Sequence, residues 1–138
     1  MISMVDDEKK EFYKDKIESG EFEEDDIHDY LTFFTEMCNE SDDVKEETDR
    51  WNRRSQFRLE GIEDAWFVVN DNEFSYGKGD IEGDPDITLE MSSYIAKGIF
   101  TGEVDAKAAY MAGDLKLVGN LPDAVRFRDL IEIVRGLL

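Results

Sequence analysis

Apolar residues recur at helical spacing in the first third of the chain. They fall on one face at about 3.6 residues per turn, and they are Ile27, Tyr30, Leu31, Phe34, Met37 and Cys38. The spacing predicts a helix that starts after Asp25 or Asp26 and ends near Asn39. A second short helix is expected over residues 44–48. Residues 1–24 are charge-dense with a weak apolar stripe, which predicts an acidic lead that is a loosely attached helix or partly disordered.

From about Trp51 the apolar period changes from helical spacing to two. Alternation of apolar and polar residues, typical of strands, marks residues 56–60, 74–76 and 86–91. Residues 65–70 are apolar on both faces, as in an interior strand. Four strands in a row joined by short turns predict an antiparallel sheet.

Helical spacing returns after Ser92. It predicts two short helices, over residues 93–100 and 105–112, and a longer one over residues 121–138, with a fifth strand at 115–117 between them. The apolar stripe of the last helix is wider than docking on a sheet requires. The chain is therefore expected to form an α+β fold with a five-stranded, mostly antiparallel sheet covered by helices, and residues 25–138 are expected to form one domain.

The composition limits the number of domains and the classes of partner that the chain can have. The 138 residues suffice for one domain with a real core, since 41% are hydrophobic and 12% aromatic. Sixteen basic residues against 35 acidic ones give a net charge of −19, which repels nucleic acid and anionic membranes. The longest uninterrupted apolar run, Ala65–Val69, is far shorter than the roughly 20 residues that span a bilayer, so no stable membrane insertion is expected.

The acidic charge is concentrated in the N-terminal part. Residues 1–50 hold 19 acids and 6 bases, and residues 51–138 hold 16 acids and 10 bases. The favoured interpretation is that this acidic excess keeps the protein soluble or adapts it to a salty cytoplasm. The other interpretation is that it binds a basic protein partner. Cys38 is the single cysteine, so an internal disulfide is impossible and a reducing cytoplasm is expected. The N-terminus has no basic start followed by a long apolar run, so no secretory signal is expected.

The second half of the chain carries an ordered set of motifs, in the segment DITLEMSSYIAKGIFTGEVDAKAAYMAGDLKLVGN from Asp86. An acidic strand start is followed by an apolar alternation that ends in Met-Ser, and then by a short helix. A glycine, an Ala-aromatic-Met-x-Gly turn, a Leu-x-Leu strand and a last glycine complete the set. In this order the motifs resemble the sterol carrier protein 2 family of lipid-transfer domains, over roughly residues 27–138.

The resemblance implies an apolar tunnel between sheet and helices that holds a fatty acid, a fatty acyl-CoA or a sterol-like lipid. The lining residues expected from it are Tyr94, Ile95, Ile99, Phe100, Tyr110, Met111, Leu115, Leu117, Phe127, Ile131 and Val134. From the sequence alone an ordinary filled core is the favoured interpretation of these residues, and only the family resemblance shifts the balance toward a tunnel. The hypothesis is therefore non-catalytic carriage of a hydrophobic small molecule. The alternative is an acidic scaffold with a filled core that docks a basic protein.

A basic cluster interrupts the acidic chain near residue 50. Arg53, Arg54 and Arg58 lie close to aromatic residues, and they are candidates for contacting a ligand head group such as a carboxylate or a phosphate. The other interpretation is a solvent-exposed strand face that the acidic N-terminal half neutralises.

Catalytic and metal-binding combinations are not expected. His28 and Cys38, the single histidine and the single cysteine, are ten residues apart on one predicted helix, about 15 Å along its axis, so they form no dyad there. His28 is expected at the surface and Cys38 in the core. Acidic residues alternate from Asp80 to Asp86, but without the spacing of a calcium loop, so a solvated acidic loop is expected. No cofactor is predicted, and an enzyme acting on acyl compounds ranks last.

Overall fold

The computed structural model describes residues 7–138 and confirms the α+β class. The helices are α1 (Asp7–Ser19), the short 3₁₀ helix η1 (Glu24–Asp26), α2 (Ile27–Glu40), α3 (Asp42–Glu47), α4 (Ser93–Thr101), α5 (Ala106–Ala112) and α6 (Leu121–Gly136). The strands are β1 (Arg53–Glu60), β2 (Ala65–Asn70), β3 (Glu73–Lys78), β4 (Ile87–Ser92) and β5 (Leu115–Val118). Residues 1–6, the first part of the predicted acidic lead, lie outside the described residues.

The five strands form one sheet in the order β3-β2-β1-β4-β5. Three of the four neighbouring pairs are antiparallel, which confirms the mostly antiparallel sheet. The exception is β4, which pairs parallel to β1 with Ile87 opposite Ser55. The sequence-based expectation of successive antiparallel strands was therefore wrong at β4. Because β4 begins at the end of the sheet where β1 begins, residues 79–86 must cross the sheet to reach it.

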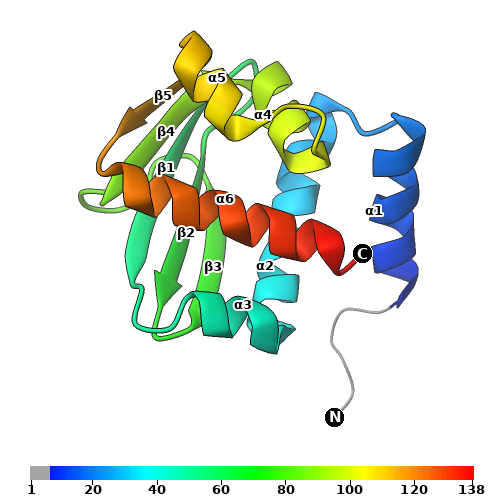
Figure 1. The fold of residues 1–138 in the computed structure, drawn as a ribbon, viewed down its shortest axis with the longest axis horizontal. Helices are drawn as coiled ribbons and strands as arrows, with labels where there is room; N and C mark the ends of the chain where they lie inside the picture. Colours follow the sequence, from blue (N-terminus) through cyan, green and yellow to red (C-terminus); the bar gives the residue numbers. More distant parts are fainter. Residues whose placement is uncertain (1–6) are drawn as a thin grey trace.

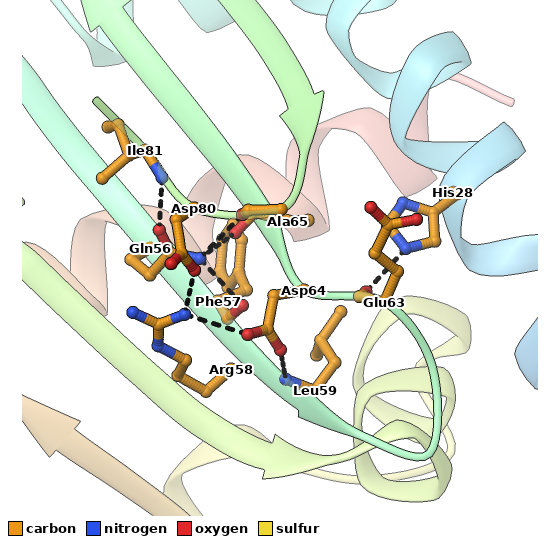
Figure 2. A network of polar contacts seen from close by, with 11 residues as sticks. His28, Gln56, Phe57, Arg58, Leu59, Glu63, Asp64, Ala65, Asp80 and Ile81 are labelled. Atoms are coloured by element: carbon orange, nitrogen blue, oxygen red, sulfur yellow. Dashed lines mark hydrogen bonds and ion pairs between the residues drawn. The ribbon is translucent and has the colours of Figure 1, made fainter.

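The crossover is held down by Gln56 in the middle of β1 (Figure 2). The Gln56 side chain is 1% exposed. Its Nε2 donates hydrogen bonds to the carbonyls of Ala65 (3.0 Å) and Gly79 (3.1 Å), and its Oε1 accepts one from the Ile81 amide (2.7 Å). A buried amide with both ends paired incurs little desolvation penalty, so Gln56 ties β1, β2 and the crossover together.

The acidic residues of the crossover are also tied to β1. Arg58 pairs with Asp80, and its Nη1 lies 2.9 Å from the Asp64 carboxylate. Arg54 donates to the Glu82 carbonyl, and the Arg54 amide donates to Asp86 (2.8 Å). Residues 80–86 thus form the acidic loop expected from the sequence, with its four carboxylates exposed, and this loop is anchored to β1.

Replacing Gln56 with leucine is expected to lower the free energy of unfolding by about 2 kcal/mol. The substitution leaves the Ile81 amide and two carbonyls without their partner at a buried position. Urea denaturation measures the loss, and limited proteolysis should show earlier cleavage within residues 79–86. Thr88→Val, at a half-buried position of β4, is the control. An equal effect of both substitutions would contradict the role given to Gln56.

The helices lie on one face of the sheet, and α6 crosses this face with α4 and α5 on one side of it and α3 on the other (Figure 1). Helix α6 contacts α2, α3 and α4. The core on this face is aromatic. Phe67 of β2 lies 5.6 Å from both Phe34 of α2 and Phe127 of α6, measured between ring centroids. Phe57 of β1 lies 5.1 Å from Phe127. These edge and tilted contacts join the strands to both helices.

Helix α1 is attached to the rest of the domain through aromatic side chains. Tyr13 and Phe22 are buried, and their rings lie 5.2 Å and 5.5 Å from that of Tyr30 on α2. Burial raises the pKa of Tyr13 to about 12, with further increases from Asp29 and other nearby acids. Residues 7–24 therefore contribute to the core, while the division of the chain at residue 24 stays a prediction. Within residues 7–138, no helix is long and apolar enough to cross a bilayer.

Candidate functional site

An apolar cavity of about 500 Å³ lies between the sheet and helices α4, α5 and α6. Its size is typical of sites for small organic ligands, which range over about 300–1,000 Å³. The residues that line it are Phe57, Leu89, Met91, Ala96, Ile99, Phe100, Ala106, Lys107, Tyr110, Met111, Leu115, Leu117, Leu121, Ala124, Val125, Phe127, Arg128 and Ile131. A space of this size lined by apolar side chains distinguishes the region from a close-packed core.

Strand alternation builds the floor of the cavity. Phe57 of β1 is opposite Leu89 of β4 in the parallel register, and Leu89 in turn is opposite Leu117 of β5. Met91 and Leu115 form the next pair along β4 and β5. Because side chains on alternate positions share a face, all five point to the helical side of the sheet.

Local sequence signals place α4 and α5 over this floor. The Ser92 hydroxyl accepts a hydrogen bond from the Ile95 amide (3.1 Å) and so caps α4, and Gly102 ends the helix with φ 87°. A Cβ at Gly98 would overlap Val104, so the glycine lets the turn before α5 pack closely on α4. Small side chains at Ala96 and Ala106 then leave space beneath these helices.

Helix α6 forms the remaining wall, and its N-terminal end is fixed to β1. Asn120 caps the helix by accepting from the Asp123 amide (2.9 Å). The buried Asp123 carboxylate accepts from Trp51 Nε1 (2.9 Å) and from Arg53 Nε (2.8 Å). Burial alone would raise the pKa of Asp123, but the bonds from Arg53 and Trp51 outweigh it and hold this pKa below its usual value. The N-terminal end of α6 is therefore fixed relative to the start of β1.

The cavity reaches the surface between α5 and α6. Several of its lining side chains are exposed, with Met111 at 76% and Leu121 at 51%, and Tyr110 and Val125 lie beside them. Single exposed apolar residues are ordinary, but a group of them around a hollow marks a binding site.

The structure brings most of the sequence-predicted lining residues together. Those at the cavity are Ile99, Phe100, Tyr110, Met111, Leu115, Leu117, Phe127 and Ile131. Three others lie elsewhere. Tyr94 is 64% exposed with the Lys97 ammonium 5.4 Å from its ring, Ile95 borders a separate polar hollow, and Val134 is fully buried outside the cavity. Tyr94 and Ile95 are two and one positions before the lining residue Ala96, so they point in other directions on α4. Val134 shares a helix face with Ile131, but it lies one turn further along α6, where the side chains are packed.

The predicted head-group arginines do not line the cavity. Arg53 is engaged with Asp123, Arg54 with the Glu82 carbonyl, and Arg58 with Asp64 and Asp80. Arg54 and Arg58 alternate with Phe57 on β1 and thus fall on the opposite face of the sheet. These partners of the arginine side chains all lie beyond residue 60, not in the acidic residues 1–50 that the sequence suggested.

Two cations at the cavity were missed from the sequence, Lys107 of α5 and Arg128 of α6. A signal was available for both. Arg128 lies four residues after Ala124, and Lys107 lies four residues before Met111, so each shares a helix face with a lining residue. Charged residues on an otherwise apolar helix face would have pointed to them.

The lining offers little for acid–base or nucleophilic catalysis. Among the described lining residues there is no histidine, cysteine or carboxylate. Cys38 is fully buried on α2, which raises the pKa of its thiol far above the usual range. His28 is half-buried, where the sequence predicted a surface position, because its ring contacts the Tyr76 hydroxyl and the Glu63 carbonyl (2.7 Å). Over residues 7–138, no group of three or more His, Cys, Asp or Glu side chains is placed to hold a metal ion.

The fold and the cavity define a class: a small α+β domain with an internal apolar site between sheet and helices. Sequence comparison then gives the family. Residues 34–132 match the SCP-2 sterol transfer family, and the chain belongs to this family. The match covers the floor and all three helical walls of the cavity. The resemblance seen in the sequence is confirmed, and membership supports a role in lipid binding or transfer.

Solved structures show the same fold. The UbiJ-SCP2 ubiquinone synthesis protein aligns with a TM-score of 0.64 and 15% identity over 76% of this chain and 87% of its own. The apo form of sterol carrier protein 2 from Yarrowia lipolytica aligns with a TM-score of 0.58 and 22% identity over 75% and 87%. A stereoselective inverting sec-alkylsulfatase from Pseudomonas sp. aligns with a TM-score of 0.60 and 17% identity, but this chain covers only 15% of that enzyme. No curated protein matches the chain.

Proposed function

We propose that the chain binds and carries a hydrophobic small molecule in the cavity between its sheet and helices. The observation that carries the proposal is the apolar space of about 500 Å³ with its opening between α5 and α6. Transfer of an alkyl chain from water into such a space is favourable by about 0.8 kcal/mol per methylene group. A fatty acid, a fatty acyl-CoA or a sterol-like lipid would supply the apolar surface that this site needs, and the cavity would then serve as the lipid tunnel.

The lining supports binding rather than catalysis. Its polar members are Lys107, Tyr110 and Arg128, and the remaining members are apolar. Orientation and binding need few polar groups, whereas acyl chemistry needs a positioned acid, base or nucleophile. We therefore propose a non-catalytic role, in the cytoplasm, where a chain with one buried cysteine needs no oxidising compartment. A basic protein partner for the acidic residues 1–50 stays a prediction from charge.

Binding of a fluorescent acyl probe tests the proposal. Protein stripped of lipid is expected to bind the probe saturably at one site, and unlabelled lipid should displace it. Protein purified without stripping should release lipid in mass spectrometry under denaturing conditions. A titration that rises linearly without saturation, for protein that is folded by circular dichroism, would contradict carriage.

A further inference from the structure

Charge is distributed very unevenly between the cavity region and the rest of the chain. Residues 93–138, which contain the three helical walls, hold six acidic and six basic residues and are neutral. The protein as a whole carries −19, so the acidic excess lies entirely in residues 1–92. An anion is therefore repelled by most of the surface but not by the face that opens into the cavity.

Arg128 is the cation most directly placed at this site. It lines the cavity from α6, yet its Nε is buried and has no hydrogen-bond partner in the part of the chain that the structure describes. Its guanidinium forms one weak ion pair, with the neighbouring Asp129 at 3.6 Å. A buried donor without an acceptor is unfavourable, so the described residues leave the hydrogen-bonding capacity of this guanidinium only partly used.

Lys107 provides a second cation on the opposite wall. It lines the same cavity from α5, it is exposed, and residues 7–138 supply no ion pair for it. The other arginines near the sheet differ, because Arg53 and Arg58 are each held by a carboxylate. Two cations with unfilled donors thus border an apolar space that opens between their helices.

We propose that the guest is an anionic amphiphile, such as a long-chain carboxylate or an alkyl phosphate. Arg128 and Lys107 bind its head group, and its chain fills the cavity. This assignment rests on the proposed carrier function and deepens it by selecting against neutral lipids. Arg128 also borders a hollow that Glu103, Asp105 and Glu132 line, and these carboxylates limit how strongly any anion is held.

Ligands that share one alkyl chain and differ in head group test the assignment. We expect the wild-type protein to bind a long-chain fatty acid about tenfold or more tightly than the fatty alcohol of equal length, since charge-assisted hydrogen bonds are lost with the alcohol. Arg128→Gln should remove most of this preference and change alcohol binding less than twofold. Lys107→Gln should reduce it severalfold. The alkyl phosphate, measured in parallel, shows which of the two anionic heads the site prefers.

Lys116→Gln is the matched control, because Lys116 is an exposed cation on β5 that does not line the cavity. It should leave the preference for the acid unchanged. Equal binding of acid and alcohol by the wild-type protein would overturn the anionic assignment while leaving carriage intact, and this comparison needs no variant. If neither ligand binds, the proposed function itself fails. An equal loss of selectivity in Arg128→Gln and Lys116→Gln would show that only overall charge matters, which also overturns the assignment.

Discussion

Replacing Ala124 with tryptophan is expected to weaken acyl-probe binding by about two orders of magnitude. Ala124 is partly buried on α6 and lines the cavity, so an indole there would occupy space that the guest needs. Exclusion of about four methylene groups at 0.8 kcal/mol each corresponds to an approximately 200-fold loss of affinity. Because the indole enters a cavity and not a close-packed core, the free energy of unfolding should change by no more than about 1 kcal/mol.

Ala108→Trp is the control for this experiment. Ala108 is exposed on α5 and does not line the cavity, so the same side-chain change there should leave the dissociation constant within twofold of the wild-type value. Fluorescence titration gives the affinities, and urea denaturation shows whether both variants stay folded. Unimpaired binding by Ala124→Trp would place the guest outside this cavity.

The order of helices and strands followed closely from apolar periodicity. The strand predicted over residues 65–70 has the bounds of β2, and the change of period after Ser92 coincides with the start of α4. These features depend on local patterns, on caps such as Ser92 and on glycines such as Gly102. Local signals of this kind are the part of a fold that a single sequence records best.

The pairing of β4 with β1 could not be read from the same patterns. Gln56 looks like an ordinary polar residue on a strand, and its burial depends on the crossover at residues 79–81. The partners of Arg53 are also distant, since Asp123 lies 70 positions further along the chain. Pairings at such separation are set by tertiary packing, which explains why the sequence could name the arginines only as candidates for a head-group contact and could not identify their partners.

The limits of the cavity were only partly predictable, for a related reason. Ile131 and Val134 belong to one apolar stripe of α6, yet Ile131 lines the cavity and Val134 is buried outside it. A stripe shows which face of a helix avoids water, but it does not distinguish packed from unfilled space. The family resemblance supplied the hypothesis of a cavity.

Loss of the Asp123 carboxylate is the substitution that we expect to destabilise the protein most. Asp123 anchors the start of α6 through Trp51 and Arg53, and its side chain is 7% exposed. Removing one partner of a buried ion pair costs about 3–5 kcal/mol, and Arg53 is one-third exposed and can regain water, so Asp123→Ala should lose about 3 kcal/mol. Urea denaturation measures this, and dissociation of the acyl probe should be faster because α6 is a wall of the cavity.

The pH dependence of this loss separates the charge from the packing. The pKa of Asp123 is lower in the folded protein than the value of about 3.9 expected when unfolded, so its contribution is complete above that value and disappears as the pH falls through the folded pKa. The difference in unfolding free energy between wild type and Asp123→Asn should therefore be largest above about pH 5 and shrink below about pH 4. Asparagine keeps the shape and one acceptor, so a difference that stays constant over this range would mean that the carboxylate charge does not hold α6 to β1.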